Sequence, residues 1–278
     1  MASSDAPIDV GHVALVVRDL DKVSTFYQQV LGLETLSSDG EVRRMGAKGT
    51  TLLELRQDKA ARVRDPREAG LFHTAFLLPS HQELANWLGH VARIRAQIQG
   101  ASDHLVSEAI YLADPEGNGI EVYADTPRDT WQHSASGVVM TTEHLDLNAL
   151  LSEADADWQG MPAGSVIGHV HLKVGAIPEA ESFYTSVLGM KIKARYPGGS
   201  FYASGDYHHH LATNIWNSRG AKPLVGGETG LAEVELRATK AEHDAIAVRA
   251  GLTGEVLTLA DPWNIPLTIK MKDETHAG

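Results

Sequence analysis

Residues 11–34, GHVALVVRDLDKVSTFYQQVLGLE, recur in altered form as residues 168–191, GHVHLKVGAIPEAESFYTSVLGMK. The two copies share identical residues at a constant offset of 157 (168 − 11), among them Gly11, His12, Val13, Phe26, Tyr27, Val30, Leu31 and Gly32. A constant offset means that neither copy has gained or lost a residue within this stretch. The chain therefore contains an internal duplication, and this duplication decides the fold.

Each copy predicts the same local structure. It begins with an apolar, β-branched stretch of about seven residues, which is typical of a strand. A helix is expected next, because the apolar residues from Val23 to Leu31 recur at the spacing of one helix face. Gly32 follows, where a helix commonly ends in a left-handed residue. Further strands are predicted at 41–47 and 50–57, which completes a β-α-β-β-β module.

A second kind of module follows each copy. It spans 70–125, with a strand, a helix at 81–97 and two strands around an Asp-Pro-Glu-Gly-Asn-Gly turn, and its counterpart spans 230–271. The chain is therefore expected to contain four modules in two halves. The expected segments are 8–125 as the half that bears a metal site, 126–165 as a linker with a short helix at 145–154, and 166–272 as a half with a degenerate site.

The composition excludes several classes of function. With a net charge of −12, the chain offers no basic surface for nucleic acid or for an anionic membrane. It has no cysteine, which excludes disulfides and thiolate catalysis. No signal peptide and no apolar stretch of about 18 residues is visible. A cytoplasmic protein is expected.

Polar side chains interrupt apolar strand faces at four positions: His12, Glu54, His73 and Glu121. An unpaired charge on such a face is costly, and two imidazoles with one or two carboxylates suit Fe(II), Mn(II), Ni(II) or Zn(II). We therefore expect His12, His73 and Glu121 to share one divalent ion. Taken singly, each histidine could instead be a hydrogen-bonded core or surface residue, and Glu54 could point to solvent.

The GHV strand, the FYxxVLG helix and the DPEGNGIE turn and strand resemble the vicinal oxygen chelate superfamily, which includes glyoxalase I, extradiol dioxygenases and bleomycin-resistance proteins. The stretches GASDHLVSEAIYLADPEGNGIEVYAD, IGHVHL and DYHHHL are most similar to four-module bacterial proteins of the catechol 2,3-dioxygenase-like group. The resemblance implies an α+β fold in which four βαβββ modules pair into two U-shaped half-barrel sheets with helices outside. It also implies that His12, His73 and Glu121 are metal ligands, and that Glu54 matches the additional carboxylate of glyoxalase I.

The second half keeps only the first-strand histidine of this set, His169. Glu233 and Thr268 stand where the first half has His73 and Glu121. We therefore expect the second half to have lost the metal site.

A histidine triplet, His208 to His210, also lies in the second half. One interpretation is a separate site, built with His169 and Glu233. The other is a cluster of exposed or mutually hydrogen-bonded imidazoles, since no second carboxylate completes a ligand set there.

The resemblance favours extradiol cleavage of a catechol-type aromatic. Tyr111 lies ten residues before Glu121, as in those dioxygenases, and His104 is a candidate acid–base group. The alternatives are a core aromatic for Tyr111 and a surface loop residue for His104. No further acid–base histidine is evident in LRQDKAARVRDPREAG, residues 55–70.

Two other functions remain open. A glyoxalase I-like lyase or isomerase would use Glu54 as a fourth ligand, and a binding protein for a small molecule such as an antibiotic would need no catalysis. The expected cofactor is one divalent ion, with Fe²⁺ favoured over Mn²⁺, Ni²⁺ or Zn²⁺. The expected partner is a small-molecule substrate, and a homo-oligomer is compatible with the sequence.

Overall fold

The computed structural model describes residues 6–134 and 137–272. The strands are β1 Ile8–Val17, β2 Glu34–Asp39, β3 Val42–Ala47, β4 Thr50–Gln57, β5 Gly70–Leu77, β6 Gly100–Asp103, β7 Ser107–Ala113, β8 Gly119–Asp125, β9 His133–Ser134, β10 Gly137–Val138, β11 Glu143–His144, β12 Val166–Lys173, β13 Lys191–Tyr196, β14 Gly199–Ala203, β15 Leu211–Asn214, β16 Gly230–Ala238, β17 Val256–Ala260 and β18 Pro266–Met271. The helices are α1 Leu20–Phe26, α2 His81–Ile94, α3 Leu147–Ser152, α4 Ile177–Ser186 and α5 Lys240–Ala250.

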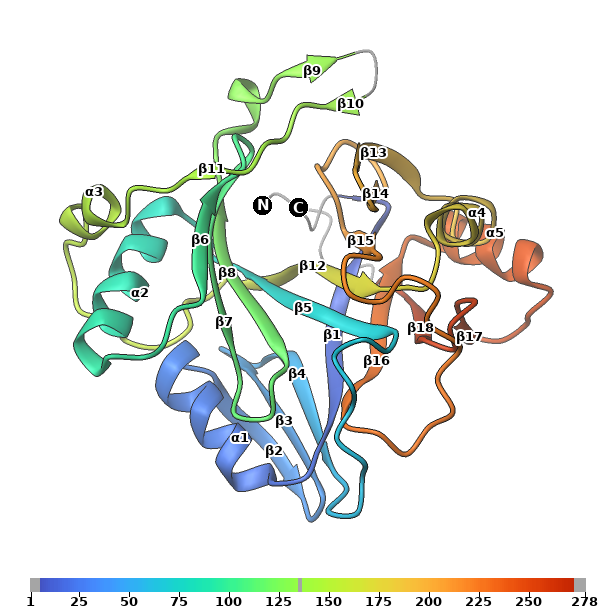
Figure 1. The fold of residues 1–278 in the computed structure, drawn as a ribbon, viewed down its shortest axis with the longest axis horizontal. Helices are drawn as coiled ribbons and strands as arrows, with labels where there is room; N and C mark the ends of the chain where they lie inside the picture. Colours follow the sequence, from blue (N-terminus) through green and yellow to red (C-terminus); the bar gives the residue numbers. More distant parts are fainter. Residues whose placement is uncertain (1–5, 135–136, 273–278) are drawn as a thin grey trace.

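Two large sheets form the molecule, and the helices lie outside them (Figure 1). One sheet has the order β17-β18-β16-β1-β4-β3-β2, and the other has the order β11-β6-β7-β8-β5-β12-β15-β14-β13. The expected α+β fold of four modules in two curved sheets is confirmed. Among the described residues, no helix is long and apolar enough to cross a membrane.

The sheets pair the modules differently from our expectation, which placed the first and second modules together within 8–125. β1 pairs antiparallel with β16, so the first module joins the fourth, and β5 pairs antiparallel with β12, so the second joins the third. In each module the last strand pairs in parallel with the first strand, for example β8 with β5. The other edge of each first strand can therefore pair with the first strand of another module. The pattern of residues along the strand does not determine which module supplies that partner. The segment boundaries themselves stay a prediction.

The helix ends follow the sequence signals. α1 continues through a π-helical turn, Tyr27–Leu31, and ends at Gly32 with φ = 73°, the left-handed conformation that glycine adopts without strain.

The linker contacts both of the first two modules. Its helix α3 packs against α2, and Met161 N–H donates to the Gly32 carbonyl over 2.9 Å. One continuous apolar core runs through both sheets. The linker therefore packs into the same core as the two sheets, through residues such as Leu150 and Met161.

Candidate metal centre

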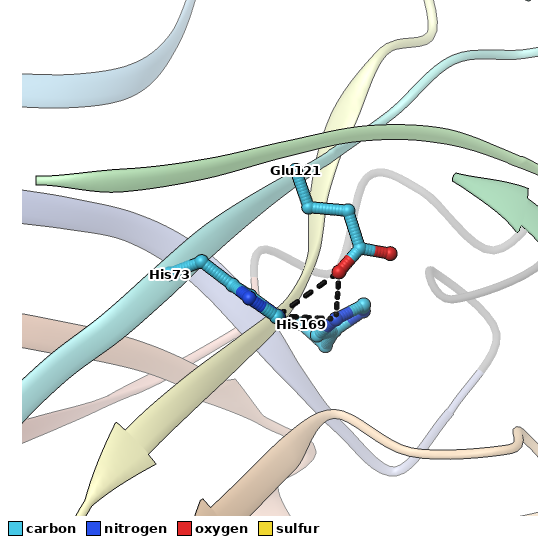
Figure 2. Close-up of side chains that lie close together, drawn as sticks. All are labelled: His73, Glu121 and His169. Carbon is cyan, nitrogen blue, oxygen red and sulfur yellow. Dashed lines mark hydrogen bonds and ion pairs between the residues drawn. The ribbon is translucent and has the colours of Figure 1, made fainter. Parts of the chain in front are cut away.

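Three buried side chains converge where the second and third modules meet. His73 comes from β5, Glu121 from β8 and His169 from β12 (Figure 2). Glu121 Oε2 lies 2.9 Å from His73 Nε2 and 3.2 Å from His169 Nε2, and the two imidazole nitrogens are 3.3 Å apart. In the described part of the chain, these residues are the only group of three or more His, Asp or Glu side chains with ligand atoms this close together.

The strand register brings the three residues together. Ala75, at the middle of β5, pairs with Glu121 on β8 and with His169 on β12. His73 lies two positions from Ala75 along β5, so the alternation of the strand places both on the same face. Because β5 pairs with both neighbouring strands, the site depends on the join between the second and third modules.

The electrostatics of the cluster suit a cation. Burial by itself raises the pKa of Glu121, but the imidazoles of His169 and His73 outweigh it and hold that pKa well below its usual range. Burial lowers the pKa of His169 to about 4, although Glu121 opposes the shift. At neutral pH the group therefore presents a carboxylate and a neutral His169 imidazole, and no Lys or Arg within the described residues forms an ion pair with Glu121.

The donor set and its spacing fit a divalent transition metal. Ligand atoms held at about 2.1 Å from an ion and at right angles to each other lie roughly 3.0 Å apart. The three distances in the cluster, 2.9, 3.2 and 3.3 Å, are close to that separation. Two imidazoles and one carboxylate on one face also leave the opposite positions open, as in the facial triad of non-haem Fe(II) oxygenases.

His12 does not lie with these residues. It is on β1 in the other sheet, where its Nδ1 lies 3.4 Å from Glu235 Oε1. The expectation that His12, His73 and Glu121 form one cluster is therefore not met by the geometry. The reason is the module pairing: the first strand that flanks β5 is β12, which carries His169, and not β1.

Glu54 is also remote from this cluster. Its carboxylate accepts hydrogen bonds from Arg56 Nε over 2.6 Å and from Arg44 Nε over 2.7 Å. Arg56 also donates to Glu233 over 2.8 Å. Burial alone raises the pKa of Glu54, but the arginines outweigh it and lower that pKa. The carboxylate that was predicted as an additional ligand is thus neutralised by guanidinium groups.

This arginine cluster is the counterpart of the metal candidate in the other sheet. Ala14 of β1 pairs with Glu54 on β4 and with Glu233 on β16. Ala75 pairs in the same way with Glu121 and His169 in the other sheet. Arg56 supplies a positive charge between the two carboxylates. One sheet thus holds a set that fits a metal ion, and the other holds an internal cation.

A cavity of about 730 Å³ opens over the three converging residues. Tyr111 and His104 line it. The Tyr111 hydroxyl donates to His104 Nε2 over 2.7 Å, while His104 Nδ1–H donates to the Thr141 carbonyl over 2.6 Å. Burial, together with the nearby Glu121, raises the pKa of Tyr111 well above its usual value, so its hydroxyl stays protonated. The predicted pair therefore lies at the same cavity as the triad.

His209 is a further cavity residue, which the sequence alone did not place at this site. Its ring lies 4.1 Å from that of His169 between centroids. Its Nδ1 is 2.7 Å from His208 Nδ1, and His208 Nε2 donates to Asp125 over 3.1 Å. Burial holds the pKa of His209 well below its usual value, so the imidazole is neutral. The triplet is thus partly a mutually hydrogen-bonded cluster and partly a wall of the cavity.

The sequence held a signal for both missed residues. His169 repeats His12 within the duplicated strand, and it is brought to the site by the join between β5 and β12. His209 lies two residues before β15, which pairs with β12 and so lies beside it. To place either residue at the site, one must know which modules lie side by side, and the pattern of residues along a strand does not give this information.

Comparisons with known proteins agree with this architecture. The profile of the Glyoxalase/Bleomycin resistance protein/Dioxygenase superfamily matches residues 9–122 and 166–262. Catechol-2,3-dioxygenase from Bacillus subtilis (strain 168) is 38% identical over 264 residues, which cover 89% of this chain and 92% of that protein.

Solved structures share the fold at low sequence identity. A putative dioxygenase from Bacillus subtilis subsp. subtilis str. 168 superposes with a TM-score of 0.62 at 12% identity, covering 95% of this chain and 84% of that one. Glyoxalase I from Zea mays superposes with a TM-score of 0.58 at 16% identity, covering 96% and 93%. At these identities the likeness extends to the fold alone.

Proposed function

The chain belongs to the glyoxalase/bleomycin resistance protein/dioxygenase superfamily, and from this membership we propose that it is a metal-dependent extradiol dioxygenase that cleaves a catechol-type aromatic ring. His73, Glu121 and His169 would hold the divalent ion. When bound, iron would act as a Lewis acid and join a catecholate to O₂ so that an electron passes between them.

The observation that carries this proposal is the three-residue set at the floor of an open cavity. Three protein ligands on one face leave room for a bidentate substrate and a further small ligand. The cavity of about 730 Å³ is within the range of small-molecule sites and accommodates a substituted aromatic ring. The 38% identity to a catechol-2,3-dioxygenase supports the same reaction class.

The Tyr111–His104 pair suits the removal of a substrate proton. The Tyr111 hydroxyl already donates to His104 Nε2, and the Thr141 carbonyl holds the proton of this imidazole on Nδ1. A substrate hydroxyl that donates to the Tyr111 oxygen would therefore have a proton path toward His104. His209, neutral and beside His169, is a second candidate base on the other side of the site.

The position of Glu54 favours ring cleavage over a lyase or isomerase that needs a fourth carboxylate ligand. Glu54 is bound by Arg44 and Arg56 in the other sheet and does not line the cavity. Ala212 of β15 pairs with His171, two residues beyond His169, just as Glu121 of β8 pairs with Ala75, two residues beyond His73. The third module therefore has an alanine, and no carboxylate, at the strand position that matches Glu121.

Loading with iron tests the proposal. The purified protein is loaded with Fe(II) without oxygen, mixed with catechol or 3-methylcatechol, and then exposed to air. We expect oxygen uptake and a yellow ring-fission product with the wild-type protein and neither with His169→Ala. Absence of oxygen uptake with all these catechols, together with turnover of a hemithioacetal, would contradict ring cleavage and support the lyase.

Tyr111→Phe tests the proton path. Loss of the hydroxyl removes the donor to His104, so we expect kcat to fall by about 100-fold while the metal content stays that of the wild type. Tyr202→Phe is the matched control, because Tyr202 is buried and its hydroxyl bonds to Thr213 outside the cavity. Equal kcat values for the two variants would exclude this role of Tyr111.

A further inference from the structure

Lys173 is a nearly buried cation at the cavity wall. It is the last residue of β12, is 9% exposed, and donates from Nζ to the Pro66 carbonyl over 2.9 Å. Among residues 6–134 and 137–272, no carboxylate forms an ion pair with this ammonium. The acidic side chains whose charge acts on it, Asp65 and Glu68, are already paired with Arg67 and Arg62 over 2.8 and 3.0 Å.

The charge of Lys173 is costly in this position. Burial, reinforced by the positive charge of Arg64, lowers its pKa to about 8. The side chain is therefore still mostly protonated at pH 7, with two ammonium hydrogens that the Pro66 carbonyl does not take. A buried ammonium without a counter-ion is stabilised when an anion reaches it. Among the described residues, Glu121 is the only acidic one that lines the cavity, and it belongs to the metal candidate.

The strand alternation places this cation at a fixed distance from the metal candidate. His169, His171 and Lys173 alternate along β12, and all three line the cavity. Four residues of strand separate His169 from Lys173 by about 13 Å along the chain. The cavity therefore has a metal-binding end and a cationic end on the same strand.

Aromatic side chains occupy the space between the two ends. The ring of His171 lies 4.9 Å from that of Phe72, 5.4 Å from that of Trp216 and 5.7 Å from that of Phe201, between centroids. These residues also line the cavity. This part of the wall suits an apolar or aromatic body and offers no second charge.

We propose that Lys173 binds a carboxylate at the far end of the substrate, so that the substrate is a catechol bearing a singly charged carboxylate on a side chain or second ring. A single ammonium balances one negative charge, which favours a carboxylate over a dianionic phosphate. The catechol end of this assignment rests on the proposed function. The recognition of the carboxylate does not, because it needs only the cavity and Lys173.

A binding measurement on the full chain tests the carboxylate site without turnover. Titration calorimetry compares 4-phenylbutyrate with its uncharged analogue, 4-phenylbutyramide. We expect the wild-type protein to bind the carboxylate about tenfold more tightly than the amide. Lys173→Met should abolish the preference because methionine keeps the unbranched shape without the charge, and Lys173→Arg should keep most of it.

Two results would overturn the assignment: a wild-type protein with no preference for the carboxylate, including one that binds neither compound, or a preference that survives in Lys173→Met. A turnover measurement separates this failure from that of the proposed function. With 3-(2,3-dihydroxyphenyl)propionate and 3-propylcatechol as substrates, ring cleavage of both with equal kcat/KM would sink the Lys173 assignment and retain the dioxygenase. Selective binding of the carboxylate without ring cleavage of either catechol would retain the Lys173 assignment and contradict the dioxygenase.

Discussion

His12 and His169 occupy the same place in two copies of one strand, yet only His169 faces Glu121. At this scale the sequence predicted much of the site: His73 and Glu121 do converge, and Tyr111 and His104 do line their cavity. The failure at His12 has a definite cause. Alternation along a strand determines the face on which a side chain lies, but not which strand lies beside it.

Asp261 provides a prediction at the residue scale. It is 3% exposed, and its carboxylate accepts hydrogen bonds from the backbone of Trp263 and Ile265 and from the Tyr184 hydroxyl. Burial nevertheless raises its pKa from 3.8 to about 6. Between these two values the folded state binds more protons than the unfolded state, so this group makes the free energy of unfolding fall as the pH rises.

Asp261→Asn removes this titration and keeps an oxygen that accepts from both backbone N–H groups. We compare the free energy of unfolding of the variant with that of the wild type at roughly pH 5 and pH 7.5. We expect the difference to shift in favour of the variant by about 1 kcal/mol from the lower to the higher pH, because only the wild type has to ionise a buried carboxyl group. Urea unfolding at both pH values measures the difference. Parallel stability curves for the two proteins would show that Asp261 does not titrate in this range.

At the scale of elements, the join between first strands determines the chemistry. The join of β5 with β12 brings two histidines together with Glu121 of the neighbouring β8. The join of β1 with β16 brings Glu233 of β16 beside Glu54 and Arg56 of the neighbouring β4. The sequence predicted the modules and their strands, because periodicity and turn residues are local signals. It did not predict the partners, because every first strand has a similar apolar pattern.

Arg56→Met tests the structural role of the arginine cluster. The substitution leaves Glu54, which is 5% exposed, and Glu233 without their shared cation, so we expect a loss of about 1–3 kcal/mol in the free energy of unfolding. Arg44→Met is the matched control: the Arg44 side chain is 51% exposed and, within residues 6–134 and 137–272, pairs with Glu54 alone, so its loss should cost less than about 1 kcal/mol. Equal losses in chemical denaturation would argue against a special role for Arg56.

At the scale of the whole molecule, the two halves of the chain are interlocked. Each large sheet contains strands from before and after the linker, and the metal candidate takes His73 and Glu121 from one half and His169 from the other. The duplication predicted two similar halves, but it did not predict that they exchange strands. We therefore expect the chain to behave as one cooperative unit.

Cleavage of the linker tests this interlocking. For this test, a protease site is engineered into the exposed 3₁₀ turn Arg128–Thr130, and the folded protein is treated with the protease. We expect the two fragments to elute together in size-exclusion chromatography and to separate only in denaturant. The reason is that each large sheet contains strands from both fragments. Two separate species in native buffer would mean that the modules pair within each half.

We infer that side chains from both halves of the chain hold one divalent ion. The most direct test is the metal content of the wild-type protein, His169→Ala and His12→Ala after loading with Fe(II) or Mn(II) and removal of free ions by gel filtration. We predict about one ion per chain in the wild type and in His12→Ala, and none in His169→Ala. Retention of the ion by His169→Ala, with its loss from His12→Ala, would show that the ion is not bound where the second and third modules meet.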